Sequence, residues 1–202
     1  MGTVMRSAAI TISAGVPGTI VINEIDYDQP MTDAGEFIEL HNPGVSAFDL
    51  ANVVVVLING SGGTEYARAA LSGSLAPGGY VVVGITGQTI PGLPAGATRV
   101  NLTGSGASGI QNGAPDGVMV IRTTDGELLD ALSYEGSITT TAAIGGRTYS
   151  LVEGTAVTVI DDGATTTNHS LGRVPNGSDT DDASADWEVV TRVTPGASND
   201  EM

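Results

Sequence analysis

Two short stretches near the start of the chain decide its fold: Ile20-Val21-Ile22-Asn23-Glu24-Ile25-Asp26-Tyr27-Asp28 and Gly35-Glu36-Phe37-Ile38-Glu39-Leu40-His41-Asn42-Pro43-Gly44. Each is a short apolar run with carboxylates inside it, and a polar connection over residues 29–34 joins the two. Residues of one face recur with a period of two, which is typical of a β-strand. The stretches therefore predict a β-hairpin, and Asn42-Pro43-Gly44 ends it because proline does not extend a strand ladder.

The rest of the chain repeats this pattern of short strands and turn signals. Val53-Val54-Val55-Val56-Leu57-Ile58 predicts a strand that is buried on both faces, since four consecutive valines favour a strand over a helix. Asp125-Gly126 between two apolar runs is the strongest hairpin signal. Further short strands are expected over residues 81–85, 98–102, 118–122, 128–134, 148–152, 156–160, 170–175 (an edge strand) and 187–191, and a strand or a helical turn over residues 65–71. About ten strands at a spacing of roughly ten residues predict an all-β fold, a β-sandwich.

Composition supports a domain with a substantial core. The chain has 202 residues, of which 41% are hydrophobic and only 4% aromatic, so the core is expected to consist mainly of Val, Ile, Leu and Ala. We expect an N-terminal extension or linker over residues 1–18, one domain over residues 19–199 and a tail over residues 200–202. Residues 1–18 lack the pattern of a signal peptide, and we expect the sequence to be part of a longer chain.

The charge balance excludes some classes of partner. The chain has 23 acidic and seven basic residues, a net charge of −16, and all of the basic residues are arginines. Two explanations for the absence of lysine stay open: drift in a genome that favours arginine codons, or adaptation to a salty exterior. Direct binding to a nucleic-acid backbone is disfavoured, because no basic stripe is available to neutralise phosphates. The sequence contains no cysteine and no apolar run of about 20 residues, so we expect neither disulfides nor a membrane-spanning helix.

Five motifs in order resemble the lamin-tail domain family, over about residues 19–199. They are Val21–Ile25 with Glu36–Gly44 and Phe48–Leu50, then Leu75-Ala76-Pro77-Gly78-Gly79-Tyr80, then Asn112–Val118 with Leu128–Tyr134, then His169–Asp181, and finally Ala185-Asp186-Trp187 with Thr194–Asn199. The resemblance implies an immunoglobulin-like β-sandwich. It also implies an accessory module of a bacterial exported protein, located outside the cell or at its surface. The chain departs from the family at Ala51-Asn52-Val53, where relatives often carry Gly-Trp, so its core must pack differently there.

The chain has few histidines but many carboxylates that could act in catalysis. His41 and His169 are the only histidines, and without cysteine they make a zinc site or a catalytic triad improbable. The first hairpin carries four acidic residues that could act as a glycosidase acid/base pair, namely Glu24, Asp26, Glu36 and Glu39. The shortage of aromatic residues argues against a sugar-binding cleft. The alternative is that Glu24 and Glu39 accept hydrogen bonds from loop amides and fix the hairpin.

Calcium is the cofactor that the acidic loops suggest, because carboxylate and carbonyl oxygens suit a hard cation. One candidate set lies in the closing loop and consists of Asp179, Asp181, Asp182 and Asp186. The other lies in the first hairpin and consists of Asp26, Asp28 and Asp33. Neither matches an EF-hand loop, so solvated acidic loops remain the alternative for both.

Two functional hypotheses follow. The first is a non-catalytic immunoglobulin-like module that contacts a protein or glycan partner, or other domains of a longer chain, or acts as a spacer, with calcium stiffening its loops. The second is a secreted hydrolase, or its regulatory part, that uses the acidic hairpin. We favour the first, with no catalytic residues and no cofactor other than calcium. Two carboxylates facing one cavity would favour the second.

Overall fold

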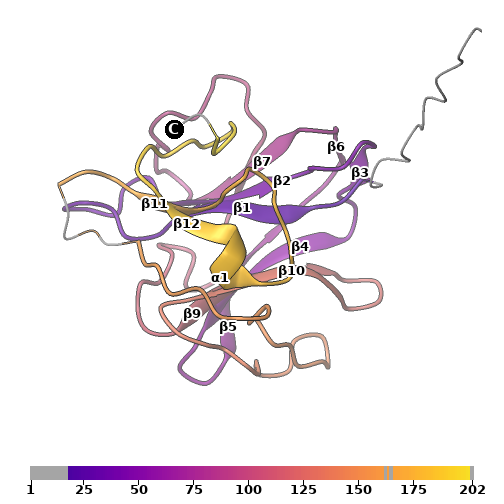
Figure 1. Ribbon diagram of the computed structural model, residues 1–202. Helices are drawn as coiled ribbons and strands as arrows, with labels where there is room; N and C mark the ends of the chain where they lie inside the picture. Colours follow the sequence, from indigo (N-terminus) through magenta and orange to yellow (C-terminus); the bar gives the residue numbers. More distant parts are fainter. Residues whose placement is uncertain (1–17, 162, 164–165, 201–202) are drawn as a thin grey trace, which may run out of the picture.

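The strands form two stacked sheets (Figure 1), and the computed structural model describes residues 18–161, 163 and 166–200. The larger sheet has six strands in the order β12-β11-β1-β2-β7-β8 and the smaller has four in the order β10-β9-β4-β5. The larger sheet consists of β1 (Val21–Asp26), β2 (Phe37–His41), β7 (Tyr80–Gly84), β8 (Arg99–Asn101), β11 (Ser170–Arg173) and β12 (Trp187–Val190). The smaller consists of β4 (Val53–Asn59), β5 (Thr64–Ala70), β9 (Asp116–Arg122) and β10 (Glu127–Tyr134). The predicted all-β fold, an immunoglobulin-like β-sandwich, is confirmed.

Two minor elements complete the structure. The short strands β3 (Phe48–Asp49) and β6 (Ser74–Leu75) pair with each other. The four-residue helix α1 (Ala183–Asp186) directly precedes β12 and buries Ala183 in the central core. Among the described residues, no helix is long and apolar enough to span a membrane.

A β-bulge explains how β1 carries both core residues and buried carboxylates. The register between β1 and β2 shifts between Ile22 and Glu24, so the strict alternation of the two faces is interrupted there. Ile22 and Ile25 both pack in the central core between the sheets. Asn23 and Glu24 are fully buried too, but their side chains bond to the C-terminal segment.

Long connections cover the outer faces of both sheets. Side chains of the connection over residues 138–151 pack against the outer face of the smaller sheet, and Ile90 packs on Phe37 and Val82 of the larger one. The predicted burial of Val53–Ile58 on both faces is therefore confirmed. The hairpin at Asp125-Gly126 is confirmed as well: it joins β9 to β10, and Gly126 has the positive φ of +69° that its turn requires.

Three sequence-based expectations about strands need comment. Residues 148–152 and 156–160 are not strands; Tyr149 and Leu151 are buried by lying across the smaller sheet rather than by joining a ladder. The segment over residues 170–175 is not an edge strand, because β11 lies between β12 and β1. Residues 65–71, left open between strand and helical turn, belong to strand β5. Of the N-terminal extension expected over residues 1–18, all but residue 18 lies outside the described residues.

Candidate functional site

Glu24 and Glu39 lie opposite each other on β1 and β2, and both are fully buried. The Glu24 carboxylate accepts hydrogen bonds from Ser170 Oγ at 2.5 Å, from Thr194 N at 3.0 Å and from Thr194 Oγ1 at 3.0 Å. Every one of these donors comes from the last third of the chain. Glu24 therefore holds the C-terminal segment to the hairpin formed by β1 and β2.

Glu39 performs the same task one strand further along. It accepts hydrogen bonds from Asn23 Nδ2 at 2.8 Å and from Gly196 N at 2.5 Å. Burial raises the pKa of Glu24 to about 7 and raises that of Glu39 well above its ordinary value. The alternative in which these two carboxylates hold loop amides is thus confirmed.

Asp26 and Glu36 lie nearer to the loop that joins β1 to β2, and each is 1% exposed. Asp26 Oδ2 accepts from Gln29 Nε2 at 3.0 Å and from Asn168 Nδ2 at 2.7 Å, and Glu36 Oε1 accepts from Ile110 N at 2.9 Å. Burial raises the pKa of Asp26 to about 6 and that of Glu36 to about 8. These two carboxylates also bind groups from distant parts of the chain.

Asp161 joins this end of the hairpin, and sequence reasoning missed it. Its Oδ2 accepts from Tyr27 N at 2.9 Å and from Asp28 N at 3.2 Å, and burial raises its pKa to about 8. The predicted ligand Asp28 contributes its backbone here, and the exposed Asp33 accepts from Gln29 N at 2.9 Å. Asp161-Asp162-Gly163 had only the pattern of a polar loop, which contains no sign of its distant partners.

A buried arginine organises a second group of carboxylates. Arg173 of β11 is fully buried and bonds to Asp130 at 3.0 Å, Asp186 at 3.1 Å, Asp179 at 3.3 Å and Glu153 at 3.4 Å. We call these five residues the arginine cluster. Burial and the nearby Asp130 carboxylate raise the pKa of Glu153 to about 8.

The remaining contacts of Arg173 fix its position. Its Nε donates to the carbonyl of Ile22 at 2.8 Å, and its guanidinium lies 5.2 Å from the centre of the Trp187 ring. Sequence reasoning missed Arg173 as well. The available signal was a single arginine inside a predicted strand, followed by a loop rich in aspartate.

The four aspartates predicted to bind calcium in the closing loop serve different partners. Asp179 and Asp186 bind Arg173, and Asp182 caps α1 by accepting from Ser184 N at 3.2 Å. Asp181 is exposed, and its amide donates to Asp179 Oδ1 at 3.3 Å. Across the described ranges, no group of three or more His, Asp or Glu side chains is arranged to hold a metal ion. Calcium at either predicted set stays a prediction.

The ring of His41 takes part in a local contact at the end of β2. It stacks on Tyr80 with ring centres 4.4 Å apart, and Nδ1 lies 3.1 Å from the carbonyl oxygen of Gly79. Burial lowers its pKa. This is the arrangement expected of a hydrogen-bonding residue beside a turn.

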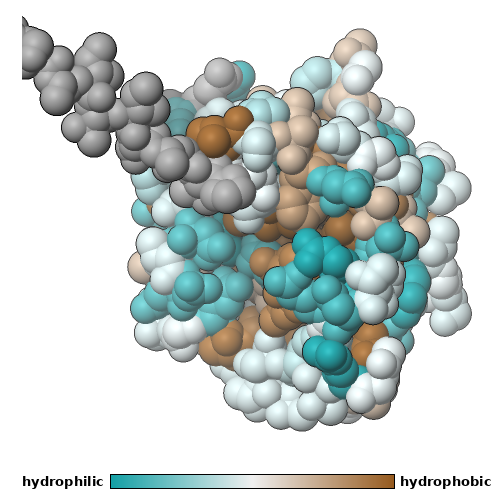
Figure 2. Space-filling view, turned by 90° about the vertical axis from the view of Figure 1, so that its right-hand side faces the viewer, coloured by the Kyte–Doolittle hydropathy of each residue, from teal (hydrophilic) through white to brown (hydrophobic). Residues whose placement is uncertain are grey.

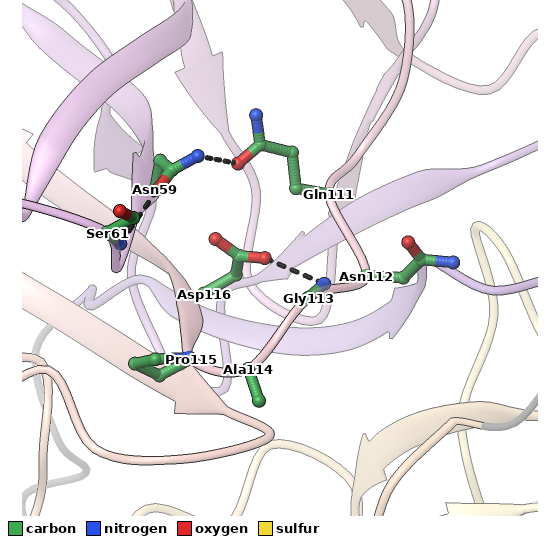
Figure 3. A pocket seen from close by; sticks show the side chains of 8 residues that line it. All are labelled: Asn59, Ser61, Gln111, Asn112, Gly113, Ala114, Pro115 and Asp116. Carbon is green, nitrogen blue, oxygen red and sulfur yellow. Dashed lines mark hydrogen bonds between the residues drawn. The ribbon is translucent and has the colours of Figure 1, made fainter.

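Cavities of the described surface show how accessible carboxylates are distributed. Figure 3 shows a cavity of about 350 Å³ whose lining includes Asn59, Gln111 and Asp116. Both oxygens of Asp116 are taken by backbone amides, those of Gly60 at 3.3 Å and Gly113 at 2.9 Å. Four other cavities in the described part of the chain are likewise lined by at most one carboxylate each. None of the five places two carboxylates face to face, the arrangement that a hydrolase of the expected kind needs.

Comparison with known proteins gives one match. The family described as Lamin Tail Domain matches residues 13–136, which is more than half of the chain. The matched range ends shortly after β10, whereas β11 and β12 continue the same sheet beyond it. No curated protein and no solved structure matches the chain.

Proposed function

Because the chain belongs to the lamin tail domain family, whose members are immunoglobulin-like domains, we propose that it acts as a non-catalytic accessory module. The module is part of a longer, exported bacterial protein, secreted or held at the cell surface. It contacts a protein or glycan partner or other domains of that chain, or spaces those domains apart.

The observation that carries the proposal is the occupation of the acidic hairpin. Glu24 and Glu39 are fully buried and accept hydrogen bonds from the segment around Thr194 and Gly196. A catalytic acid or base has to reach the substrate, and these carboxylates reach only the protein's own backbone and side chains. These hydrogen bonds hold the C-terminal segment to strands β1 and β2.

The surface supports contacts of moderate polarity. Figure 2 shows one face of the molecule, on which hydrophobic areas are separated by hydrophilic ones. The exposed large hydrophobic side chains of the described residues come from separate segments, and they are Met31, Val45, Leu128 and Ile160. Such a surface suits a polar or transient contact better than a large apolar interface.

The test compares two substitutions in the hairpin with a matched control. In Glu24→Gln and Glu39→Gln proteins we expect a lower thermal midpoint and no enzymatic activity to lose, measured on glycoside, ester and phosphodiester substrates. Asp116→Asn is the control, because Asp116 is a buried carboxylate that lines a cavity and accepts its hydrogen bonds from Gly60 and Gly113, outside the C-terminal segment. Hydrolysis by the unmodified protein that disappears in Glu24→Gln at unchanged stability would instead support the hydrolase.

A further inference from the structure

Buried side-chain oxygens without a hydrogen-bond partner gather at the loop end of the first hairpin. Among the described residues, all of the buried side-chain oxygens that lack a partner belong to five residues: Asp26, Glu36, Gln88, Asp161 and Asn168. Asp26 and Asp161 are each 1% exposed, and each leaves its Oδ1 without a donor. An unpaired buried acceptor costs about 1–3 kcal/mol, and more when it is charged. Their concentration at one place points to a missing ligand.

Hydrogen bonds bring three of these residues to the end of β1, where Asn168 bonds to the Asp26 side chain and Asp161 bonds to the backbone that follows Asp26. Asp161 Oδ2 binds the amides of Tyr27 and Asp28, which directly follow Asp26, at 2.9 and 3.2 Å. Asn168 Nδ2 donates to Asp26 Oδ2 at 2.7 Å, so the amide oxygen Oδ1 is the part of Asn168 that remains unused. Asp26, Asp161 and Asn168 therefore all lie at the end of β1, each with one unused oxygen.

The chemistry of the unused atoms selects the ligand. All are oxygens, and two of them belong to carboxylates that share a buried site. A water molecule would supply hydrogen bonds but no positive charge, whereas a hard cation binds several oxygens at once and favours the ionised form of both carboxylates. Asn168, together with Gln29, also lines a cavity of about 310 Å³.

We propose that Asp26, Asp161 and Asn168 bind a calcium ion that fastens the late segment of the chain to the end of β1. The site shares only Asp26 with the hairpin set expected from the sequence, because Asp161 and Asn168 take the places of Asp28 and Asp33. The site contains only two carboxylates, and the described residues hold no group of three acidic or histidine side chains arranged for a metal ion. Water and backbone oxygens therefore have to complete the six to eight ligands of calcium. Such a site is expected to bind with a dissociation constant on the order of 10⁻⁴–10⁻³ M, as extracellular modules do.

The decisive experiment is calorimetric titration of calcium chloride into chelator-treated protein, with thermal melts in chelator and in millimolar calcium. We expect one bound calcium, a higher thermal midpoint with calcium, and a weaker response to magnesium, which requires a smaller octahedral site. Asp161→Asn should lower the affinity at least tenfold. In chelator this variant should remain folded, because its remaining oxygen still accepts from the two amides.

Two control variants place the ion. Asp116→Asn, whose carboxylate oxygens are both satisfied by amides, and Asp181→Asn in the closing loop should keep the full affinity. If Asp161→Asn does not fold, Asn168→Ala, at a half-buried position, takes its place. Absence of calcium binding to the unmodified protein at millimolar concentration overturns the proposal. So does binding that survives in Asp161→Asn but is lost in Asp181→Asn. No partner is needed for any of these measurements, so their outcome is independent of the proposed function.

Discussion

The arginine cluster and the acidic hairpin both contain buried carboxylates, but the carboxylates bind different kinds of partner in the two regions. In both, carboxylates are buried inside a chain with a net charge of −16. In the arginine cluster a fully buried guanidinium bonds to Asp130, Glu153, Asp179 and Asp186. In the hairpin, the partners of Glu24 and Glu39 are amide and hydroxyl groups.

The difference shows where each region is vulnerable. The carboxylates of the arginine cluster share one buried positive charge, so removal of the arginine is the severe change. A buried carboxylate held by neutral donors responds to pH, because its pKa is raised by burial. The arginine cluster should therefore be sensitive to substitution and the hairpin sensitive to protons.

The largest effect is expected from Arg173→Met. The substitution keeps an apolar side chain of similar length but leaves Asp130 and Asp186 buried without their counter-charge. Loss of one partner of a buried ion pair typically destabilises a protein by about 3–5 kcal/mol. Urea denaturation should show a loss of this size, and adding Asp130→Asn should recover part of it. A loss below about 1 kcal/mol would mean that the cluster contributes little to folding.

The second effect concerns the pH dependence that Glu24 confers. Its pKa rises from 4.5 to about 7 on folding, so the native state binds the proton more tightly than the unfolded state does. The resulting stability is fully present below pH 4.5 and is lost as the pH rises through about 7. One pKa unit corresponds to about 1.4 kcal/mol, so the change amounts to roughly 3 kcal/mol.

Denaturation midpoints measured in chelator across this pH range should therefore fall as the pH rises. Glu24→Gln removes the titrating group and should make the dependence shallower, while Arg122→Ala, at the exposed end of β9, should leave it unchanged. A midpoint that rises between mildly acidic and neutral pH would contradict the assignment.

The parts of this structure that sequence reasoning predicted are those specified by neighbouring residues. The valine run of β4 and the Asp125-Gly126 turn carry their own local pattern, and both were predicted correctly. The apolar residues of 148–152 have a similar pattern, but they cover the outside of the smaller sheet. Local alternation does not distinguish a strand that joins a sheet from a segment that lies across one.

In the candidate site, too, features specified by neighbouring residues could be predicted and features that depend on distant residues could not. The role of Glu24 and Glu39 as hydrogen-bond acceptors was one of the alternatives that the sequence left open, because a carboxylate inside an apolar strand has to find donors. Arg173 and Asp161 were missed because their partners are distant in the chain: Arg173 lies 43 residues from Asp130, and Asp161 lies 134 residues from Tyr27. Only the folded topology brings these groups together.

A third prediction concerns Asn199, which connects the two regions. It is fully buried, and its Nδ2 donates to the carbonyl of Asn23 at 2.9 Å and to that of Arg173 at 3.0 Å. Asn199→Ala leaves both carbonyl oxygens without this donor, and we expect a loss of about 1–3 kcal/mol in chemical denaturation. Ser198→Ala is the neighbouring control. Equal stability of the two variants would show that the C-terminal segment does not hold the hairpin.

The smallest effect tests whether burial, rather than charge alone, makes Arg173 important. Arg122 of β9 also pairs with carboxylates, Glu127 and Asp125, but its side chain is 33% exposed and those of its partners are more than half exposed. Water already solvates these groups, so the pair adds little, and Arg122→Ala should cost less than about 1 kcal/mol. Raising the salt concentration should reduce even this contribution, since screening acts on exposed charges, while the effect of Arg173→Met should change little with salt. Equal losses for the two arginine substitutions in the same urea titration would mean that net charge, and not the buried geometry of the arginine cluster, governs the stability of this domain.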